Sequence, residues 1–174
     1  MAGPKQAGPD FSIRQLTAAD AIAFRTLRLE ALEYHPEAYG STLANWQDLP
    51  RSAYVARIES GVIFGLFVEG RLEGMLALDP ETGGNARHRA GIHAVYIRKT
   101  LRGKGGIDLL LRAAVDRARE LGIAQLELAV VETNTRAQDA YVRNGFARFG
   151  VTPRAILFKG RYLDEILLIR RLDD

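Results

Sequence analysis

The segment between Ala90 and Val131 places the strongest constraint on the fold of this chain. It reads as a strand, "AGIHAVYI", then a glycine-rich turn at 102–106, then a helix, then a second strand, "AQLELAVV". Apolar residues recur at helical spacing from Ile107 until Gly122, which predicts an amphipathic helix with a glycine stop. A crossover of this kind is right-handed and leaves its two strands parallel. The first strand is apolar on both faces, which predicts a central position in a sheet.

The segments on either side predict further strands and helices around this unit. "VIFGLFV" and "LEGMLALD", joined by "EGR", are typical of a hairpin. A helix is expected from a capping box at Thr17 to His35, a second one over 43–59 with a break at Pro50, and a short one over 134–144. "FSIRQ" is the expected first strand, and "FARFGV" and "EILLIRRL" are the expected closing strands. The fold class is therefore α/β, with a central mixed sheet of about six to seven strands flanked by about four helices.

Length and charge bound the kind of protein. The chain has 174 residues, of which 47% are hydrophobic, enough for one domain with its own core. The Gly/Pro-rich start predicts a flexible leader over 1–10, followed by a single domain over 11–174. Basic residues number 24 and are interleaved with 21 acidic ones, for a net charge of +3. A nucleic-acid binder usually has a denser basic face, so we expect no nucleic-acid partner, and an anionic small ligand fits this balance equally well.

Cysteine and histidine usage excludes several kinds of chemistry. The sequence has no cysteine, which excludes disulfides, thiolate metal sites and a cysteine nucleophile. Its three histidines, His35, His88 and His93, do not fall in a metal-ligand spacing, so no metal is expected. The start has no apolar signal segment, and "VIFGLFV" is far too short to span a bilayer. The expectation is a cytoplasmic protein with no membrane partner.

The glycine-rich turn has the chemistry of an anion site. Helix starts expose unpaired backbone N–H groups and carry a partial positive charge, and phosphate groups bind there. Gly103, Gly105 and Gly106 allow close approach of the backbone, while Arg102 and Lys104 add charge and donors. The segment matches neither a P-loop nor a dinucleotide fingerprint. The alternative is a helix start that only needs a tight turn, and the turn alone does not decide between the two.

A second cluster follows in "NTRAQDAYVRNGF". Asn134, Ala137 and Tyr141 are spaced so that they share one face of a short helix. A small residue between an amide and a phenol could border a narrow slot. The alternative is that Tyr141 is an ordinary core residue with a solvated hydroxyl.

Taken together, these segments resemble the GNAT superfamily of acetyl-CoA-dependent N-acyltransferases. "VYIRKTLRGKGGIDLLL" is similar to the pyrophosphate motif of that family, with Arg102 and Gly105 in place and Ile107 where the family has Gly or Ala. "NTRAQDAYVRNGF" is similar to its second motif, and the strand order over Phe11–Leu172 agrees. One hypothesis is that Ile107 turns into the core while Gly106 supplies the space that the pyrophosphate needs. The other is that the pyrophosphate-binding turn is reshaped and binds the cofactor more weakly. We favour the first hypothesis because the rest of the helix start is intact.

The resemblance implies a GNAT-like fold whose two parallel strands splay apart, with an acetyl-CoA site between them. Pantetheine would pair with the freed backbone groups, and the pyrophosphate would rest on residues 102–107. The residues implied to contact acetyl-CoA are Val95, Tyr96, Ile97, Arg102, Gly103, Lys104, Gly105, Gly106, Ile107, Asn134, Ala137, Tyr141 and Arg143.

The resemblance also implies a reaction: transfer of the acetyl group to a primary amine of a small molecule, a peptide or a protein. The amine would attack the thioester directly in a ternary complex, so no covalent enzyme intermediate is needed. Tyr141 is the implied acid for the departing thiolate. His93 and Glu132 are the candidate bases; the alternatives are a packed strand histidine and a solvated carboxylate. The residues that could line the acceptor side are Glu30, Glu37 and Tyr39.

Two other hypotheses compete with this one. A catalytically idle domain that senses acyl-CoA would keep the cradle and lack an acceptor pocket. A basic RNA- or DNA-binding module would use Arg98, Lys99, Arg102 and Lys104, but it gives the second cluster no purpose. The resemblance is compatible with a homodimer, although no residue demonstrates one, and the sequence does not identify the amine.

Overall fold

The computed structural model describes residues 8–173. Residues 1–7 of the expected leader and residue 174 lie outside this range, so the division into 1–10 and 11–174 stays a prediction. Within the described range, no helix is long and apolar enough to cross a bilayer.

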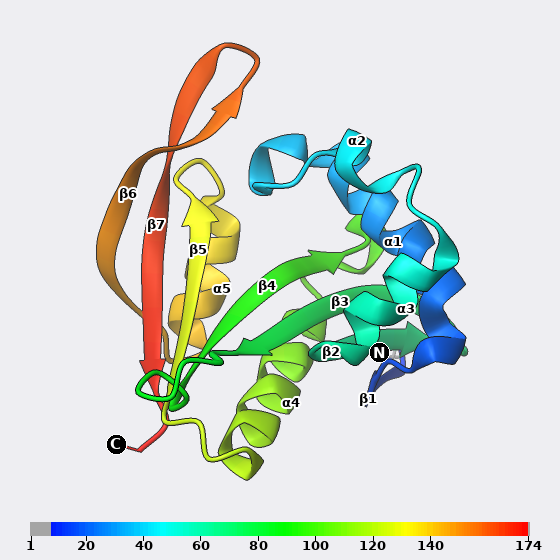
Figure 1. The fold of residues 1–174 in the computed structure, drawn as a ribbon, viewed down its shortest axis with the longest axis horizontal. Coiled ribbons are helices and arrows are strands. Elements are labelled where there is room, and N and C mark those ends of the chain that lie inside the picture. The colour runs from blue at the N-terminus through cyan, green and yellow to red at the C-terminus, as the bar shows by residue number, and fades with distance from the viewer. Residues whose placement is uncertain (1–7, 174) are drawn as a thin grey trace, which may run out of the picture.

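Seven strands form one mixed sheet in the order β1-β2-β3-β4-β5-β7-β6 (Figure 1). The strands are β1 (Phe11–Gln15), β2 (Val62–Val68), β3 (Arg71–Pro80), β4 (Arg89–Ile97), β5 (Gln125–Val131), β6 (Ala147–Phe158) and β7 (Arg161–Arg171). The α-helices are α1 (Ala21–Tyr34), α2 (Leu43–Trp46), α3 (Arg51–Glu59), α4 (Gly106–Glu120) and α5 (Thr135–Arg143). This architecture confirms the expected α/β class and mixed sheet.

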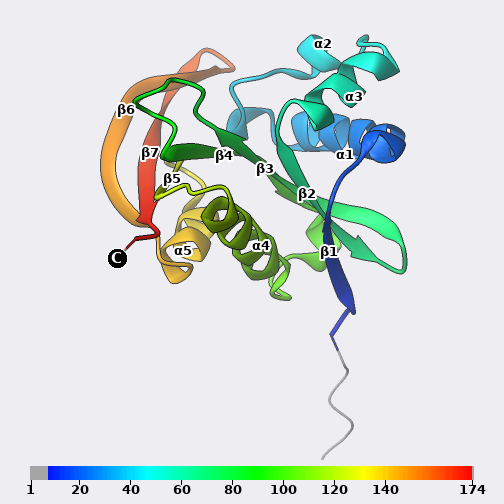
Figure 2. The same ribbon diagram turned by 60° about the horizontal axis from the view of Figure 1, so that its bottom comes forward.

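Helices cover both faces of the sheet, and each face has its own apolar core. α1 and α3 lie against one face, and α4 and α5 lie against the other (Figure 2). Side chains of β2 point to the two cores in turn. Phe64 and Leu66 belong to the α4 core, whereas Ile63 and Phe67 belong to the α1 core. Burial on both faces explains why β2 is an uninterrupted apolar run.

The crossover through α4 makes β4 and β5 parallel, which confirms the prediction. Their pairing is short, because it covers three residue pairs and ends at Gly91 and Glu127. β4 nevertheless continues to Ile97, and β5 continues to Val131. The two strands therefore separate toward their carboxyl ends, as the family resemblance implies.

The closing strands are longer than the sequence-based prediction. β6 continues to Phe158 rather than ending at Val151, and β7 begins at Arg161 rather than Glu165. The turn Lys159–Gly160 joins them, and both turn residues have positive φ, at 48° and 75°. Two such residues in succession are the geometry of a type I′ hairpin turn, so the predicted loop is the tip of a long hairpin.

The break expected at Pro50 within the helical region 43–59 is confirmed, because α2 ends at Trp46 and α3 begins at Arg51. Two helix starts differ from the prediction. α1 begins at Ala21, after a 3₁₀ turn over Ala18–Asp20, rather than directly after Thr17. α4 begins at Gly106, one residue before the expected start at Ile107. The second difference matters for the site, because it makes a glycine the first residue of the helix.

Candidate active site

β4 and β5 are joined at one end and open at the other. At the joined end the Arg89 guanidinium donates to the Glu127 carboxylate twice, Nε to Oε1 at 2.6 Å and Nη2 to Oε2 at 2.8 Å. A paired fork of this kind is strong and geometrically specific, and it fastens the short parallel ladder. Beyond the ladder a cavity opens between the two strands.

β4 is bent where it borders this cavity. Ala94 and Val95 together stand opposite one residue of β3, and Ala94 has a positive φ of 50°. Such a β-bulge redirects the backbone and often lies beside an active site. The Tyr39 hydroxyl donates to the Val95 carbonyl at 2.9 Å, so the loop after α1 holds the bend in place.

The cavity has a volume of about 710 Å³, within the range of small-molecule sites. Its wall comes from α1 and the loop after it, β3, β4, the glycine turn, the end of β5, α5 and β7. The sequence-predicted residues on this wall are Tyr39, His93, Val95, Tyr96, Ile97, Arg102, Gly103, Gly106, Ile107, Asn134, Ala137 and Tyr141. The predicted residues away from the wall are Lys104, Gly105, Glu132 and Arg143. The fold thus brings both sequence clusters to one cavity.

The glycine turn borders the cavity and begins α4. Gly105, with a φ of 85°, is the residue before the helix, and Gly106 is the first residue within it. A Cβ on Gly106 would lie 2.7 Å from Leu66 Cδ1, so the helix start packs closely against β2 and a side chain there would require Leu66 to shift. Ile107 is half-buried, packs on the core and borders the cavity. The glycines leave the N–H groups of this helix start accessible, which fits a phosphate group.

Two arginines near the turn are held by internal contacts. Nε of Arg102 donates to the Ile97 carbonyl at 2.8 Å, and its Nη2 lies 2.9 Å from Nε2 of His35. Arg143 donates to the carboxylate of Asp108 at 2.9 Å. Arg102 therefore shapes the turn, and Arg143 neutralises a carboxylate in the first turn of α4 that would oppose an anion there.

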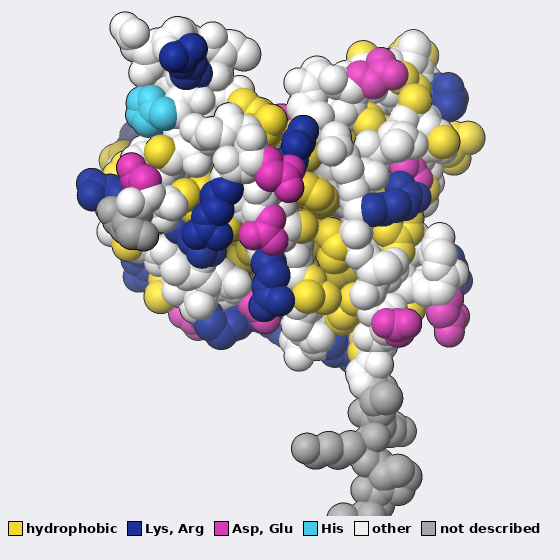
Figure 3. Space-filling model, turned by 90° about the horizontal axis from the view of Figure 1, so that it is seen from below, with side chains coloured by type: hydrophobic (Ala, Val, Ile, Leu, Met, Phe, Trp, Pro, Cys, Tyr) yellow, Lys and Arg dark blue, Asp and Glu magenta, His cyan; other side chains and the backbone are white. Residues whose placement is uncertain are grey.

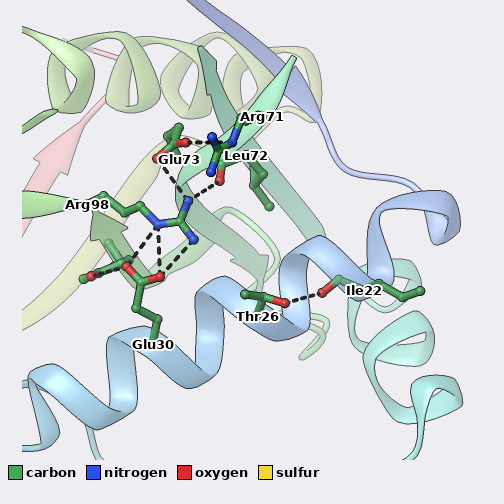
Figure 4. Close-up of polar contacts among 8 residues, drawn as sticks. Ile22, Thr26, Glu30, Arg71, Leu72, Glu73 and Arg98 are labelled. Carbon is green, nitrogen blue, oxygen red and sulfur yellow. Dashed lines mark hydrogen bonds and ion pairs between the residues drawn. The ribbon is translucent and has the colours of Figure 1, made fainter. Parts of the chain in front are cut away.

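Arg98 links the end of β4 to helix α1. Figure 4 shows its guanidinium between two carboxylates, donating to Glu30 at 2.9 Å and to Glu73 at 3.1 Å. The Tyr96 hydroxyl also donates to Glu30, at 2.9 Å. Glu30 therefore connects α1 to β4, and neither Glu30 nor Glu37 is on the cavity wall.

The distribution of charge does not favour a nucleic-acid module. Arg98 and Arg102, two of the four cations that such a module would use, have internal partners. Figure 3 shows basic and acidic side chains interspersed on the face that carries α4. A nucleic-acid surface would instead gather its cations on one face.

The second sequence cluster lies on α5 and at its start. Oδ1 of Asn134 accepts a hydrogen bond from the Ala137 N–H at 3.2 Å and caps the helix, which leaves Nδ2 to donate to a ligand. The buried Gln138, which the sequence analysis did not single out, donates to the Glu132 carbonyl at 2.9 Å and fixes α5 to the end of β5. Burial raises the pKa of the Tyr141 hydroxyl, which keeps this cavity-lining group protonated.

The candidate bases have different surroundings. His93 is exposed and borders the cavity from β4. Oε1 of Glu132 accepts a hydrogen bond from the Asp164 backbone N–H at 3.2 Å, and this side chain is not on the cavity wall. Glu165 of β7 was not among the candidates, yet it borders the cavity, and burial raises the pKa of its carboxyl. The sequence analysis missed it because it lies in the apolar run "EILLIRRL".

Another part of the wall comes from α1, the loop after it, and β3. The Arg28 guanidinium carbon lies 4.9 Å from the ring centre of Tyr39 and 5.0 Å from that of Trp46. Oδ2 of Asp79 accepts a hydrogen bond from Arg57 at 2.8 Å. Of these residues only Tyr39 was a sequence candidate. Arg28 could have been found, because it interrupts the buried apolar stripe of α1, where charged side chains are rare.

A parallel strand pair that opens beside a glycine-led helix start is the arrangement expected of an acyltransferase that uses coenzyme A. A family model described as the acetyltransferase (GNAT) family matches residues 23–146. The L-methionine sulfoximine/L-methionine sulfone acetyltransferase of Pseudomonas paraeruginosa is 30% identical over an alignment of 153 residues, with 82% of this chain and 87% of that protein covered. The chain therefore belongs to the GNAT family, and it is an acetyl-CoA-dependent N-acetyltransferase.

Solved structures share the fold at low sequence identity. A putative acetyltransferase from Salmonella typhimurium, with its cofactor acetyl-CoA, has a TM-score of 0.81 and 21% identity, with 95% of each chain covered. A phosphinothricin acetyltransferase from Sinorhizobium meliloti, in complex with acetyl-CoA, has a TM-score of 0.81 and 20% identity, with 93% of this chain and 88% of that chain covered.

Proposed function

We propose that this enzyme transfers the acetyl group of acetyl-CoA to the primary amine of a small, amino-acid-like molecule. The observation that carries the proposal is the continuous cavity, whose wall includes the glycine turn, the opened edge of β4 and the side chains of α1 and β3. An acyl donor and an acceptor can therefore meet in one site. The relative from Pseudomonas paraeruginosa, named for L-methionine sulfoximine and L-methionine sulfone, supports a small acceptor.

The chain offers matching groups for each part of the acyl donor. The helix start over 105–107 suits the pyrophosphate. The separated edges of β4 and β5 present backbone groups that an extended pantetheine arm can pair with, and Val95–Ile97 lies on that edge. Nδ2 of Asn134 would donate to the acyl donor near its thioester. The thioester supplies the activated acetyl group.

The reaction that fits these residues is direct attack of the amine on the thioester. Holding donor and acceptor together supplies much of the acceleration. Backbone N–H groups near Val95 would stabilise the charge that develops on the carbonyl oxygen. The Tyr141 hydroxyl, kept protonated by burial, gives its proton to the departing thiolate.

Removal of a proton from the acceptor is the second task. An amine that arrives neutral needs no base, whereas an ammonium must lose a proton first. His93 and Glu165 border the cavity and are the candidate bases. Glu132 would have to act through a water molecule. A cytoplasmic location and a homodimer stay predictions.

The absence of cysteine allows a simple test. Free coenzyme A can be followed with a thiol reagent without background from the protein, because the chain has no cysteine. With acetyl-CoA present, L-methionine sulfone and L-methionine sulfoximine should release the thiol and give N-acetylated products by mass spectrometry. Peptides with a free amino terminus serve as the comparison. Turnover of the peptides but not of the small molecules would contradict the small-molecule assignment. If none of the amines is turned over, the idle acyl-CoA sensor is favoured.

A further inference from the structure

Arg28 is a buried cation on the cavity wall, and no carboxylate within residues 8–173 pairs with it. It lies on α1 with a relative exposure of only 6%, and it borders the cavity. Its Nη1 atom is buried and has no hydrogen-bond partner among the described residues. Leaving a charged donor buried and unpaired is costly. A side chain retained in that state therefore indicates that something outside the chain completes it.

The surroundings of Arg28 fix its position without neutralising it. The rings of Tyr39 and Trp46 lie against the guanidinium, a contact that stabilises and orients a cation. Neither ring removes the positive charge. Arg57 and Asp79, which also border the cavity, pair with each other at 2.8 Å.

The geometry points to Arg28 as the binding site for the carboxylate of the acceptor molecule. This inference rests on the proposed function and narrows it, because it requires an acceptor that carries an amine and a carboxylate together, as a free amino acid does. A guanidinium binds a carboxylate through two parallel N–H donors. The stacked rings would hold that fork in place, and the carboxylate would supply the partner that Nη1 lacks.

The carboxylate is a better occupant than a phosphate of the acyl donor. The phosphate-compatible groups are at the start of α4, in the glycine turn, whereas Arg28 is in the middle of α1 with β3 residues nearby on the wall. A donor anchored at the glycine turn and an acceptor anchored at Arg28 would approach each other along β4. The bend at Ala94 and Val95 lies on that strand.

The test compares two acceptors and three proteins. The acceptors are L-methionine sulfone and its amide, in which the carboxylate is replaced by a neutral group while the primary amine remains. The proteins are the wild type, Arg28→Gln and the matched control Arg25→Gln. Arg25 lies on the same helix and contacts the Tyr54 ring at 5.9 Å, but it is exposed and is not on the cavity wall.

We expect Arg28→Gln to lower kcat/KM for L-methionine sulfone about 10- to 100-fold, the size of a lost charge-assisted contact. The amide should change by no more than about twofold, as expected for independent changes. Comparing each acceptor with itself across proteins cancels the difference in intrinsic amine reactivity. Arg25→Gln should leave both acceptors unchanged, and Arg28→Lys should be intermediate because it keeps the charge and loses the fork.

An equal loss for both acceptors would show that Arg28 only supports the fold, and it would overturn the inference while leaving the acetyltransferase proposal intact. Measurements of acceptor binding test the inference independently of the acetyltransferase proposal. L-methionine sulfone should raise the melting temperature of the wild type and not that of Arg28→Gln, whether or not turnover occurs. No such difference would overturn the inference. If Arg28→Gln does not fold, Arg28→Lys, compared with the wild type on each acceptor, decides the matter.

Discussion

At the scale of single residues, the cavity places polar groups where their protonation state is controlled by burial. Tyr141 is the main example, because desolvation raises the pKa of its hydroxyl and disfavours the phenolate. Glu165 shows the same effect on a carboxyl, which brings its pKa closer to that of an amine. Arg28 differs from both. Burial lowers the pKa of its guanidinium, but an arginine stays charged all the same. One cavity thus contains a candidate acid, a candidate base and an anchor.

We predict that Tyr141→Phe lowers kcat by about 10²- to 10⁴-fold, the usual contribution of a general acid. Acetyl-CoA affinity should fall far less, because the aromatic ring and its packing against Phe146 remain. Steady-state kinetics gives kcat, and equilibrium titration gives the affinity. Tyr34→Phe is the matched control, because Tyr34 is an exposed tyrosine with 65% of its surface accessible. Unchanged turnover in Tyr141→Phe would remove the acid role.

At the scale of elements, the start of α4 is the best-determined part of the donor site. A Cβ on its first residue, Gly106, would require the fully buried Leu66 of β2 to shift. Gly106 supplies the room, and Ile107 packs on the core while still bordering the cavity. The packing supports the favoured hypothesis for Ile107.

We predict that Gly106→Ala destabilises the protein by about 1–3 kcal/mol, the cost of overpacking a filled core. The new methyl group would meet the fully buried Leu66. It should also weaken acetyl-CoA binding, because the helix start must shift. Thermal unfolding and equilibrium titration measure the two effects. Gly84→Ala is the control, since a Cβ there meets nothing within 4 Å; equal behaviour of the two variants would contradict the close packing.

Most elements could be predicted from periodicity, and the failures have physical causes. The crossover and its parallel strands follow from the alternation of strand, turn and helix. The extension of β6 could not be read as easily, because Pro153 and Arg154 interrupt the apolar pattern and Arg154 has a positive φ of 53°. The dipeptide Lys159–Gly160 indicates a hairpin turn between two strands, and the prediction overlooked it.

The site could be predicted only where its chemistry is local in sequence. The glycine turn and the α5 cluster are short segments with fixed spacing, and most of their residues reach the cavity wall. Arg28, Asp79 and Glu165 come from three separate elements, and only folding brings them to one wall. Their positions depend on strand register and helix packing, which single-sequence patterns do not specify.

At the scale of the whole molecule, ligand binding and stability are linked. The cavity borders elements from both halves of the sheet, from β3 and β4 on one side to β5 and β7 on the other. A ligand that binds only the folded state adds stability that grows with the logarithm of its concentration relative to its dissociation constant. Such a ligand should therefore stabilise the molecule as a unit.

We predict that acetyl-CoA at 100 times its dissociation constant stabilises the protein by about 2.7 kcal/mol. ATP at the same concentration should have little effect, because it lacks the pantetheine arm that the strand edges would bind. Thermal melting with each ligand checks this. Equal stabilisation by ATP would indicate binding through phosphate charge alone, and no rise with acetyl-CoA would indicate that Ile107 spoils the donor site.

The short parallel ladder gives the sheet an unusual mechanical character. β1 to β4 form one antiparallel half and β5 to β7 form another, and the two halves share a seam of three residue pairs. The two halves are joined by this seam, which Arg89 and Glu127 bridge, and by the apolar core under α4, which contains Leu66 of one half and Val130 of the other. A ligand lying in the opening would supply hydrogen bonds to the separated ends of β4 and β5. The occupied enzyme should therefore have a more continuous sheet than the free one.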